Sequence, residues 1–491
     1  MSLSIATFMQ VVDTTICNVA VPTISGNLGA SNSQGTWIIT SYAVANAIAL
    51  PLTGRLAQRL GEVRLFLLST ALFTLTSFCC GISPNLSSLV FFRILQGATG
   101  GPMLPLAQSL LLTNYPKERR FMALAFFSMM ISTAPICGPI LGGYMSDNFH
   151  WSYIFFINVP FGALVFIVAK IALSGRESPL SKVPMSAAAF GFLALGVGSF
   201  QIFLDKGREL DWLNSNFIMA LGVFTVIGLT LLIVWELHSD NPLIDLRLFK
   251  YRNFSVGVIL ISLGMMLYLG TVVLLPLLLQ TWYGYTATWA GLVTAPVGLL
   301  PIVVTPILGR FGAKIDLRLV ITLGFMVFAL CMFMRAKFNP DIISVRFVVF
   351  PQFIQGFALA FFFVPIMSLA YMGLAPAKMA AASGIFNCIR VLFMGIGTSL
   401  ALTFWDKREA LHHTRLVSHI DGVSANSVEA MNSLSSLGLT QEEGLAMLVR
   451  TITKNSYVQS ANEIYFASGI CFVVMIAIIW IAKNTKERAI T

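Results

Sequence analysis

The chain has 491 residues, of which 57% are hydrophobic and only 11% are charged. Because ordinary soluble domains carry about 25% charged residues, this composition excludes a soluble globular protein and predicts an all-α polytopic membrane protein. The net charge of +10 would suggest nucleic-acid binding in a soluble protein. Here the basic residues follow the connections between apolar tracts, so we expect no nucleic-acid partner.

The chain contains fourteen apolar segments, each about as long as the roughly 20 residues that a bilayer span requires. The charge-free tract 253–309 must hold two spans, with a tight turn at Trp282 to Tyr285. The predicted spans are residues 2–24, 36–54, 65–83, 88–113, 121–146, 151–173, 185–204, 215–237, 254–281, 287–309, 318–334, 346–374, 379–404 and 461–482. All seven cysteines lie in these spans without the spacing of a metal site, and we interpret them as packing residues.

Lysine and arginine residues gather in every second connection. The basic connections are 55–64, 117–120, 176–182, 247–252, 310–318 and the segment after the last span, whereas 25–35, 84–87, 147–150 and 282–286 carry no Lys or Arg. Connections 205–214 and 335–346 are exceptions with a few basic residues. By the positive-inside rule, this pattern predicts that both termini are cytoplasmic.

Two short sequence motifs each recur later in the chain, at nearly the same offset in residue number. PLTGR at 51–55 returns as PILGR at 306–310, an offset of 255, and LQG at 95–97 returns as IQG at 354–356, an offset of 259. Transporters are commonly built from two related halves. We therefore predict a six-helix bundle in residues 1–180, an inserted helix pair in 181–245, and a second six-helix bundle in 246–491.

Away from the ends of the predicted spans, only three residues place a formal charge clearly inside the membrane: Asp13, Arg93 and Arg390. An unpaired charge at the bilayer centre costs several kcal/mol, so such residues usually face a cavity or each other. Asp13 lies about 18 Å along a helix from the chain start, roughly half-way across a bilayer. A buried acid beside an arginine suits reversible protonation. The alternative is a static ion pair that only holds helices together.

Residues 54–64 are predicted to form a short turn between the second and third spans. Its glycines permit close approach, and its basic residues lie at the cytoplasmic surface. The residues that we single out are Gly54, Arg55, Arg59, Gly61 and Arg64.

The fifth span contains small residues and prolines at helical spacing. They are Pro135, Gly138, Pro139, Gly142 and Gly143. Small faces let helix backbones pack closely, and prolines introduce bends. We expect a hinge and seal between the two halves, with ordinary helix packing as the alternative.

Residues 405–460 are predicted to form a polar loop on the outer face. Thr440 and Glu443 have the spacing of a capping box, which would open a short helix that ends near Arg450. The loop is either a docking surface outside the membrane or a disordered tether.

The chain resembles the major facilitator superfamily and, within it, the fourteen-span drug:proton antiporters, which include multidrug and fatty-acid exporters. The matching motifs are VDTTICNVAVP at 12–22, the segment 54–64, RILQG at 93–97, the fifth-span residues 135–143 and HWSYIFFINVP at 150–160. The similarity covers essentially the whole chain. It departs at Gln58, where the family usually has an acid, and at the very short segment before the first span.

The resemblance implies a fold of two six-helix bundles plus two inserted helices, which rock to expose a central site alternately to each side. It implies that Arg93, in a motif with Gln96 and Gly97, takes part in proton coupling with Asp13, and that the fifth-span motif serves antiport rather than uptake. Protons would be the coupling ion, with no other cofactor and no metal. A periplasmic adaptor and an outer-membrane channel would be the partners of this multi-pass protein of the bacterial inner membrane.

The transport cavity of such a protein is expected to be largely apolar with a few polar anchors. The candidates for substrate binding are Asn18, Asn46, Gln108, Gln280, Gln355, Asn387 and Arg390. For each amide, an interhelical hydrogen bond is an equal alternative. Arg390 would attract anionic substrates such as fatty acids.

Three other functions compete with export. An uptake permease would have the same fold, and a transport-dead sensor would signal to a partner without moving a substrate. A membrane-bound enzyme is disfavoured because the sequence has no phosphate loop and no nucleophile-base set, and none of its five histidines lies deep in a span.

Overall fold

The computed structural model describes residues 2–180, 184–311, 315–340, 345–418 and 440–483, and within them the protein is helical without strands. The α-helices are α1 (Ser2–Asn27), α2 (Asn32–Gly35), α3 (Trp37–Leu60), α4 (Glu62–Gly81), α5 (Leu86–Gly100), α6 (Met103–Asn114), α7 (Lys117–Asn148), α8 (Tyr153–Phe156), α9 (Asn158–Ala172), α10 (Ala187–Gly207), α11 (Asn216–His238), α12 (Arg252–Trp282), α13 (Ala287–Thr294), α14 (Leu299–Phe311), α15 (Leu317–Arg335), α16 (Val345–Ala370), α17 (Met379–Val417) and α19 (Gln441–Ile479). The 3-10 helices are η1 (Trp212–Asn214), η2 (Leu246–Lys250), η3 (Ala295–Gly298) and η5 (Pro376–Lys378).

Twelve helical segments of the described residues are long and apolar enough to cross a membrane, and they coincide with twelve of the predicted spans. The other two predicted spans are the 32-residue α7 and the pair α5 and α6. A turn at Gly101 and Pro102 divides that pair, because proline lacks an N–H and clashes with the preceding helical turn. The predicted turn after α12 is confirmed at Gly284, which has a φ of 71°.

The predicted turn at 54–64 is wrong in extent, because α3 remains helical to Leu60 and α4 begins at Glu62. The chain reverses at Gly61 alone, whose φ is 89°. A Cβ on Gly61 would lie 2.3 Å from Glu177 Oε1. Glu177 needs this space because its carboxylate accepts the N–H groups of Val63 and Arg64, both at 3.0 Å, and so satisfies the first turn of α4.

The prediction of a polar loop at 405–460 is also wrong. Both α17 and α19 are 39 residues long, about twice what a bilayer span requires, and the capping box at Thr440 and Glu443 opens a helix that runs unbroken to Ile479. Charged residues in a helix that extends beyond the bilayer give the same sequence pattern as a polar loop. Because water solvates these residues, they do not end the helix. The tether alternative falls mainly on 419–439, outside the described residues.

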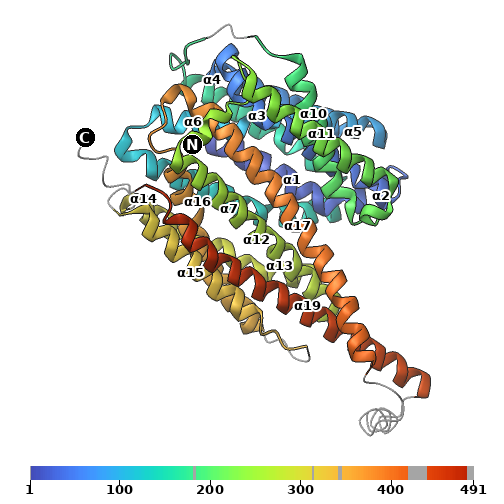
Figure 1. Cartoon of the computed structure of the whole chain (residues 1–491). Coiled ribbons are helices and arrows are strands. Elements are labelled where there is room, and N and C mark those ends of the chain that lie inside the picture. The colour runs from blue at the N-terminus through green and yellow to red at the C-terminus, as the bar shows by residue number, and fades with distance from the viewer. Residues whose placement is uncertain (1, 181–183, 312–314, 341–344, 419–439, 484–491) are drawn as a thin grey trace.

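We call residues 405–417 and 441–460 the protruding hairpin, because they extend beyond the rest of the molecule (Figure 1). Arg408 joins the two helices by donating to both carboxylate oxygens of Glu463, at 2.6 and 2.8 Å. Trp405 Nε1 donates to the carbonyl of Tyr457 at 2.9 Å. The Tyr457 ring stacks on Trp282 with 4.9 Å between centroids. These contacts join the two helices of the hairpin to each other, to Glu463 and to the end of α12.

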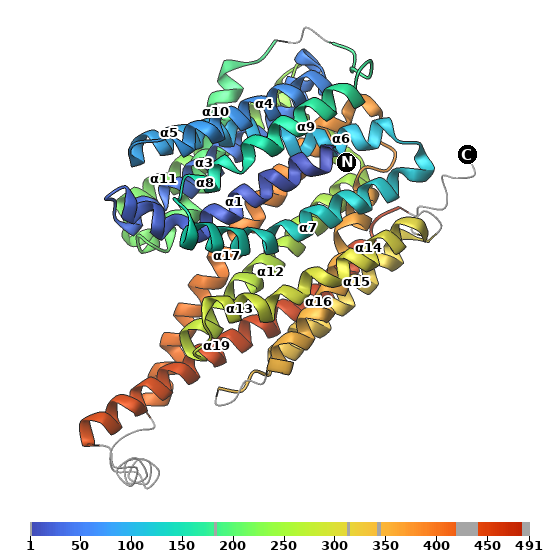
Figure 2. The same ribbon diagram turned by 180° about the vertical axis from the view of Figure 1, so that it is seen from behind.

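Helices α1 to α11 form one part of the molecule and α12 to α19 the other, with α7 and α17 where the two parts meet (Figures 1 and 2). Within the first part α7 packs on α1, and within the second α17 packs on α12. Helices α10 and α11 are the inserted pair that the sequence predicted, and they pack on each other. Helix α10 also packs on α3 of the first part and on α17 of the second. The boundaries at 180 and 245 remain a prediction.

The offset seen in sequence recurs in the packing of the two parts. A Cβ on Gly97 would lie 2.3 Å from the carbonyl oxygen of Tyr42, and a Cβ on Gly356 would lie 2.5 Å from that of Val297. The two glycines are 259 residues apart and the two carbonyls 255. Each glycine therefore allows the same close helix contact in its own half.

The two halves meet closely at the end of the molecule that carries Arg55, Arg310 and Lys378, which we call the basic end. A Cβ on Gly54 of α3 would lie 2.5 Å from Ala381 Cα of α17, and one on Gly309 of α14 would lie 3.1 Å from Ala125 Cβ of α7. The chain enters and leaves the bundle at this end as well. Leu3 shares a packed cluster with Ala380, and the N–H of Lys483 donates to Asn253, beside the start of α12.

Gly384 should be sensitive to substitution because a Cβ there would lie 2.7 Å from the carbonyl oxygen of Leu50 in the opposite half. We expect Gly384→Ala to loosen the basic end and to raise the rate at which N-ethylmaleimide modifies Cys388, which is buried against α3. Gly291→Ala is the matched control, because nothing lies within 4 Å of its Cβ position. Peptide-level mass spectrometry measures the rate. Equal rates in both variants would contradict the tight contact.

Candidate functional site

Asp13 and Arg93 form an ion pair inside the first half. Arg93 Nη1 donates to Asp13 Oδ2 at 2.7 Å, and the two side chains are 1% and 0% exposed. Asp13 lies in the middle of α1 and Arg93 in α5, which are spans one and four. The structure thus brings together the two charges that the sequence singled out.

Two amides complete the shell around the carboxylate. Asp13 Oδ1 accepts from Gln96 Nε2 at 3.1 Å and from Asn158 Nδ2 at 2.6 Å. Gln96 Oε1 in turn accepts from Arg93 Nη1 at 2.8 Å, and Asn158 also donates to Ser77 Oγ at 3.0 Å. Helices α1, α4, α5 and α9 are therefore joined through one carboxylate.

Arg93 has partners besides Asp13. Its Nε donates to the carbonyl of Ile38 at 3.1 Å, and its guanidinium lies 4.1 Å from the centre of the Tyr42 ring. Both residues belong to α3, so the arginine connects α5 to α3 as well as to α1. The carbonyl and the ring face would still stabilise the cation if Asp13 became neutral.

Protonation of Asp13 would weaken the bonds of this shell. Each carboxylate oxygen faces at least one N–H group, and a protonated carboxyl is neutral and carries an O–H donor of its own, so it would be a weaker acceptor for Arg93, Gln96 and Asn158. These donors lie on α5 and α9, whereas Asp13 lies on α1, so the weakened bonds would be contacts between helices.

Two substrate candidates, Gln108 and Asn387, instead join the halves. Gln108 Oε1 of α6 accepts from Asn387 Nδ2 and from Ser383 Oγ of α17, both at 2.7 Å, and from Tyr371 Oη at 3.2 Å. All four side chains are buried. Ser383 and Asn387 lie within one turn of Gly384, where α17 makes its close contact with the first half. The network therefore holds the basic end closed.

The remaining substrate candidates do not form one site. Asn46 is buried and donates to the carbonyl of Gly97 at 3.5 Å, as the interhelical alternative predicted, whereas Asn18 and Gln280 are exposed. Gln355 accepts a hydrogen bond from Arg335. Arg390 is 6% exposed and lies 5.3 Å from the Phe363 ring centre.

The basic residues near Gly61 differ in environment. Arg55 is buried, donates to Gln58 Oε1 at 3.1 Å and bonds the carbonyl of Pro242 in the segment before α12. Gln58 therefore binds Arg55 where the family pattern has an acid. Arg59 and Arg64 are exposed.

The fifth-span glycines pack within one half. A Cβ on Gly138 would lie 1.9 Å from Thr15 Oγ1, and one on Gly142 would lie 3.1 Å from the carbonyl of Ile16, so both face α1. Nothing lies within 4 Å of a Cβ placed on Gly143. The expected seal between halves is thus not made by these glycines in this structure. Pro135 and Pro139 lie in α7, and their side chains fall outside the description.

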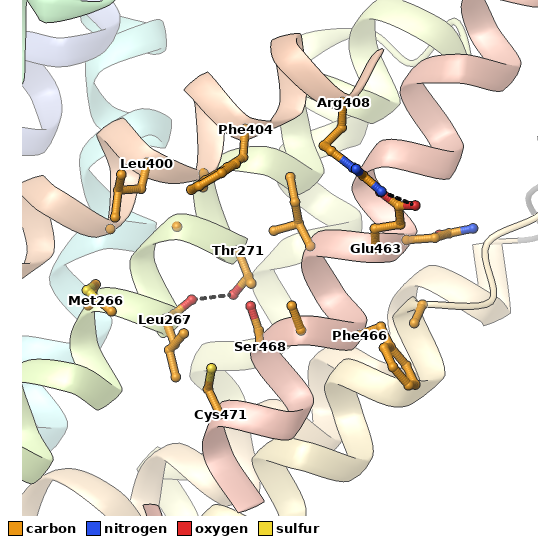
Figure 3. Close-up of a pocket in the computed structure, with 17 residues that line it drawn as sticks. Met266, Leu267, Thr271, Leu400, Phe404, Arg408, Glu463, Phe466, Ser468 and Cys471 are labelled. Atoms are coloured by element: carbon orange, nitrogen blue, oxygen red, sulfur yellow. Dashed lines mark hydrogen bonds and ion pairs between the residues drawn. The ribbon is translucent and has the colours of Figure 1, made fainter. Parts of the chain in front are cut away.

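A pocket of about 680 Å³ lies between α12, α17 and α19 (Figure 3). Its wall is apolar apart from a few groups, which include the Arg408–Glu463 ion pair. Leu400, Phe404 and Phe466 line it and are exposed on the surface of the bundle. None of the predicted substrate residues lines this pocket, which opens outward rather than between the halves.

The sequence analysis missed several buried polar residues. Asn158, the second amide on Asp13, lies in the 150–160 motif and could have been found as the amide at the start of the sixth span. Lys206 is 3% exposed and pairs with Glu209 at 2.7 Å. Arg335 is 0% exposed, although the sequence placed it in a connection. The ends of spans look alike in sequence whether they face water or protein.

Comparison with known proteins identifies relatives over nearly the full length. Residues 3–398 match the model of the Major Facilitator Superfamily. The Multidrug export protein EmrB of Escherichia coli is 50% identical over 98% of this chain and 94% of its own length. The Fatty acid resistance protein FarB of Neisseria gonorrhoeae is 48% identical over 98% of this chain and 95% of its own.

Solved structures show a similar fold. The human organic anion transporter MFSD10 aligns with a TM-score of 0.61 at 12% identity, covering 97% of this chain and 98% of that one. The proton:xylose symporter XylE aligns with a TM-score of 0.60 at 15% identity, covering 99% and 95%.

Asn158→Ala should destabilise the protein, because Asp13 Oδ1 and Ser77 Oγ each lose a buried donor. We expect a loss of about 1–3 kcal/mol, seen as a lower midpoint of thermal unfolding in detergent. Asn148→Ala is the control, because Asn148 is exposed and bonds only the carbonyl of Tyr144. If the two variants unfold at the same temperature, Asn158 does not support the carboxylate.

Proposed function

Because the chain belongs to the Major Facilitator Superfamily, we propose that it is a proton-coupled antiporter that exports amphipathic drugs or fatty acids across the bacterial inner membrane. The observation that carries the coupling is the buried Asp13–Arg93 pair with its two amides. Export of these substrate classes is supported by the names of the two relatives, each about half identical to this chain.

The orientation follows from the charges. If the basic end faces the cytoplasm, as the positive-inside rule predicts, both termini are cytoplasmic and the closed contacts at Gly54, Gly309 and Gln108 shut the cytoplasmic side. The structure then corresponds to an outward-facing state, with Asp13 paired to Arg93 and ready to receive a proton from outside.

The proton drives the return of the carrier. Protonation removes the negative partner of Arg93 and weakens the bonds that Gln96 and Asn158 donate to Asp13, which biases the packing of α1 against α5 and α9. Breaking a buried ion pair costs about 3–5 kcal/mol, so the site cannot lose its charge without a structural response. One charge that crosses 100 mV supplies ~2.3 kcal/mol, enough for a roughly fortyfold gradient of a neutral drug.

The protruding hairpin is the proposed contact for a periplasmic adaptor, through which the transporter would work with an outer-membrane channel. Leu445 and Val449 lie one turn apart on α19 and are 54% and 48% exposed. Neighbouring exposed apolar residues on a helix outside the bilayer form a surface that a partner can cover. The Arg408–Glu463 pair joins α17 and α19 at the base of the hairpin.

We expect Asp13→Asn to abolish proton-coupled efflux, because the amide cannot exchange a proton but can still accept a hydrogen bond from Arg93. Dye extrusion and substrate-induced proton release in vesicles measure the effect, and Asp211→Asn, at a turn outside the spans, is the control. Undiminished coupling in the Asp13 variant would remove this residue from the mechanism. Absence of any substrate flux in the wild type would favour a sensor, and inward flux an uptake permease.

Deleting much of 410–455 should spare transport across the inner membrane and abolish co-purification with the adaptor. A finer variant, Leu445→Glu with Val449→Glu, should have the same effect because it charges the apolar surface without shortening the helix. Thr451→Glu, at another exposed position of α19, is the control. Adaptor recovery from the double variant at the level of the control would show that this surface is not the contact.

A further inference from the structure

Arg335, the last residue of α15, is a second fully buried arginine. It has no exposed surface and lies among α15, α16 and α19, which pack side by side in the second half (Figure 1). Its Nη2 donates to Gln355 Oε1, and its guanidinium lies 5.8 Å from the centre of the Tyr465 ring. The function proposed above gives this group no role.

Arg335 has no acidic partner among the described residues. The ionisable groups that interact with its charge are Tyr268, Cys331 and Tyr465, all of which are neutral in their usual state. Glu463 lies on the same helix as Tyr465, but it bonds Arg408 and His412 instead. Within the described part of the chain, the cation is thus enclosed without a counter-charge.

The same cluster has more hydrogen-bond donors than acceptors. Four buried groups have no hydrogen-bond partner in the part of the chain that the structure describes: Arg335 Nε and Nη1, Gln355 Nε2 and the Tyr465 hydroxyl. The carbonyl end of α15 offsets part of the charge, but such an effect is worth at most about 2 kcal/mol. Several donors and a cation gathered in one enclosed place are the chemistry of an anion site.

Comparison of the two halves shows where the anion would lie. In the first half Gln96 accepts from Arg93 and donates through Nε2 to the carboxylate of Asp13. In the second half Gln355, 259 residues later, also accepts from a buried arginine, but Arg335 lies on the neighbouring helix α15, whereas Arg93 lies on the same helix as Gln96. Gln355 Nε2 has no acceptor among the described residues. The donor that faces a carboxylate in one half thus faces no acceptor in the described part of the other.

We propose that Arg335, Gln355 and Tyr465 bind one small monovalent anion, of the size of chloride or formate, which supplies the negative charge that Asp13 supplies in the first half. The ligand is small because all three side chains are 0% exposed, so a long acyl chain attached to the anion would have to enter the packed core. This site is separate from the proton site and does not depend on the direction of transport.

The test uses the full-length protein, purified in detergent, and measures its thermal unfolding in sodium chloride, sodium formate and sodium gluconate at equal ionic strength. Gluconate is too large for the site. We expect chloride, formate or both to raise the midpoint in a saturable manner, as a ligand that binds the folded state does. A rise with chloride alone identifies a halide site, and a rise with formate also identifies a site for small carboxylates.

Arg335→Met keeps most of the side-chain volume and removes the charge, so the midpoint of this variant should no longer depend on the anion. Arg208→Met is the matched control, because Arg208 is exposed and pairs with Asp406. Tyr465→Phe removes only one donor and should weaken the apparent anion affinity by about tenfold, which keeps the test valid if Arg335→Met does not fold. An anion-independent wild type, or an anion effect that persists in Arg335→Met or is unchanged in Tyr465→Phe, would overturn the proposal.

Discussion

The buried pair of Asp13 and Arg93 is the constraint on which the first half depends. Neither charge can be left without a partner in an apolar bundle. The groups that donate to the carboxylate lie on α5 and α9, and the N–H groups of the arginine bond acceptors on α1 and α3. Under the proposed function, a change in the protonation of Asp13 would weaken contacts among these four helices. This link between a single proton and helix packing is what a proton-driven carrier requires.

The two halves share their packing and differ in their charges. Gly97 and Gly356 allow the same close helix contact, and Gln96 and Gln355 each accept a hydrogen bond from a buried arginine. Among the described residues, only the first half places a carboxylate beside that arginine. A titratable acid in one half and a diffusible anion in the other would leave a single site that responds to the proton gradient.

Much of this arrangement could be predicted from the sequence. Apolar length gave the spans, and the rarity of charges within them directed attention to Asp13 and Arg93, because burial of a charge has few solutions. The length of α17 and α19 could not be predicted, since a charged helix outside the bilayer and a polar loop have the same composition. Arg335 was missed because the end of a span does not reveal what packs around it. Gln108 and Asn387 were singled out, but the choice between ligand binding and a helix contact stayed open because amides serve both equally well.

Infrared difference spectroscopy on the purified protein measures directly whether Asp13 exchanges a proton, as the proposed function requires. The stretching band of a protonated carboxylic acid should change when a substrate dye binds to the wild type, and this change should be absent in Asp13→Asn. An identical band change in both proteins would place the exchanged proton on another group and contradict the account.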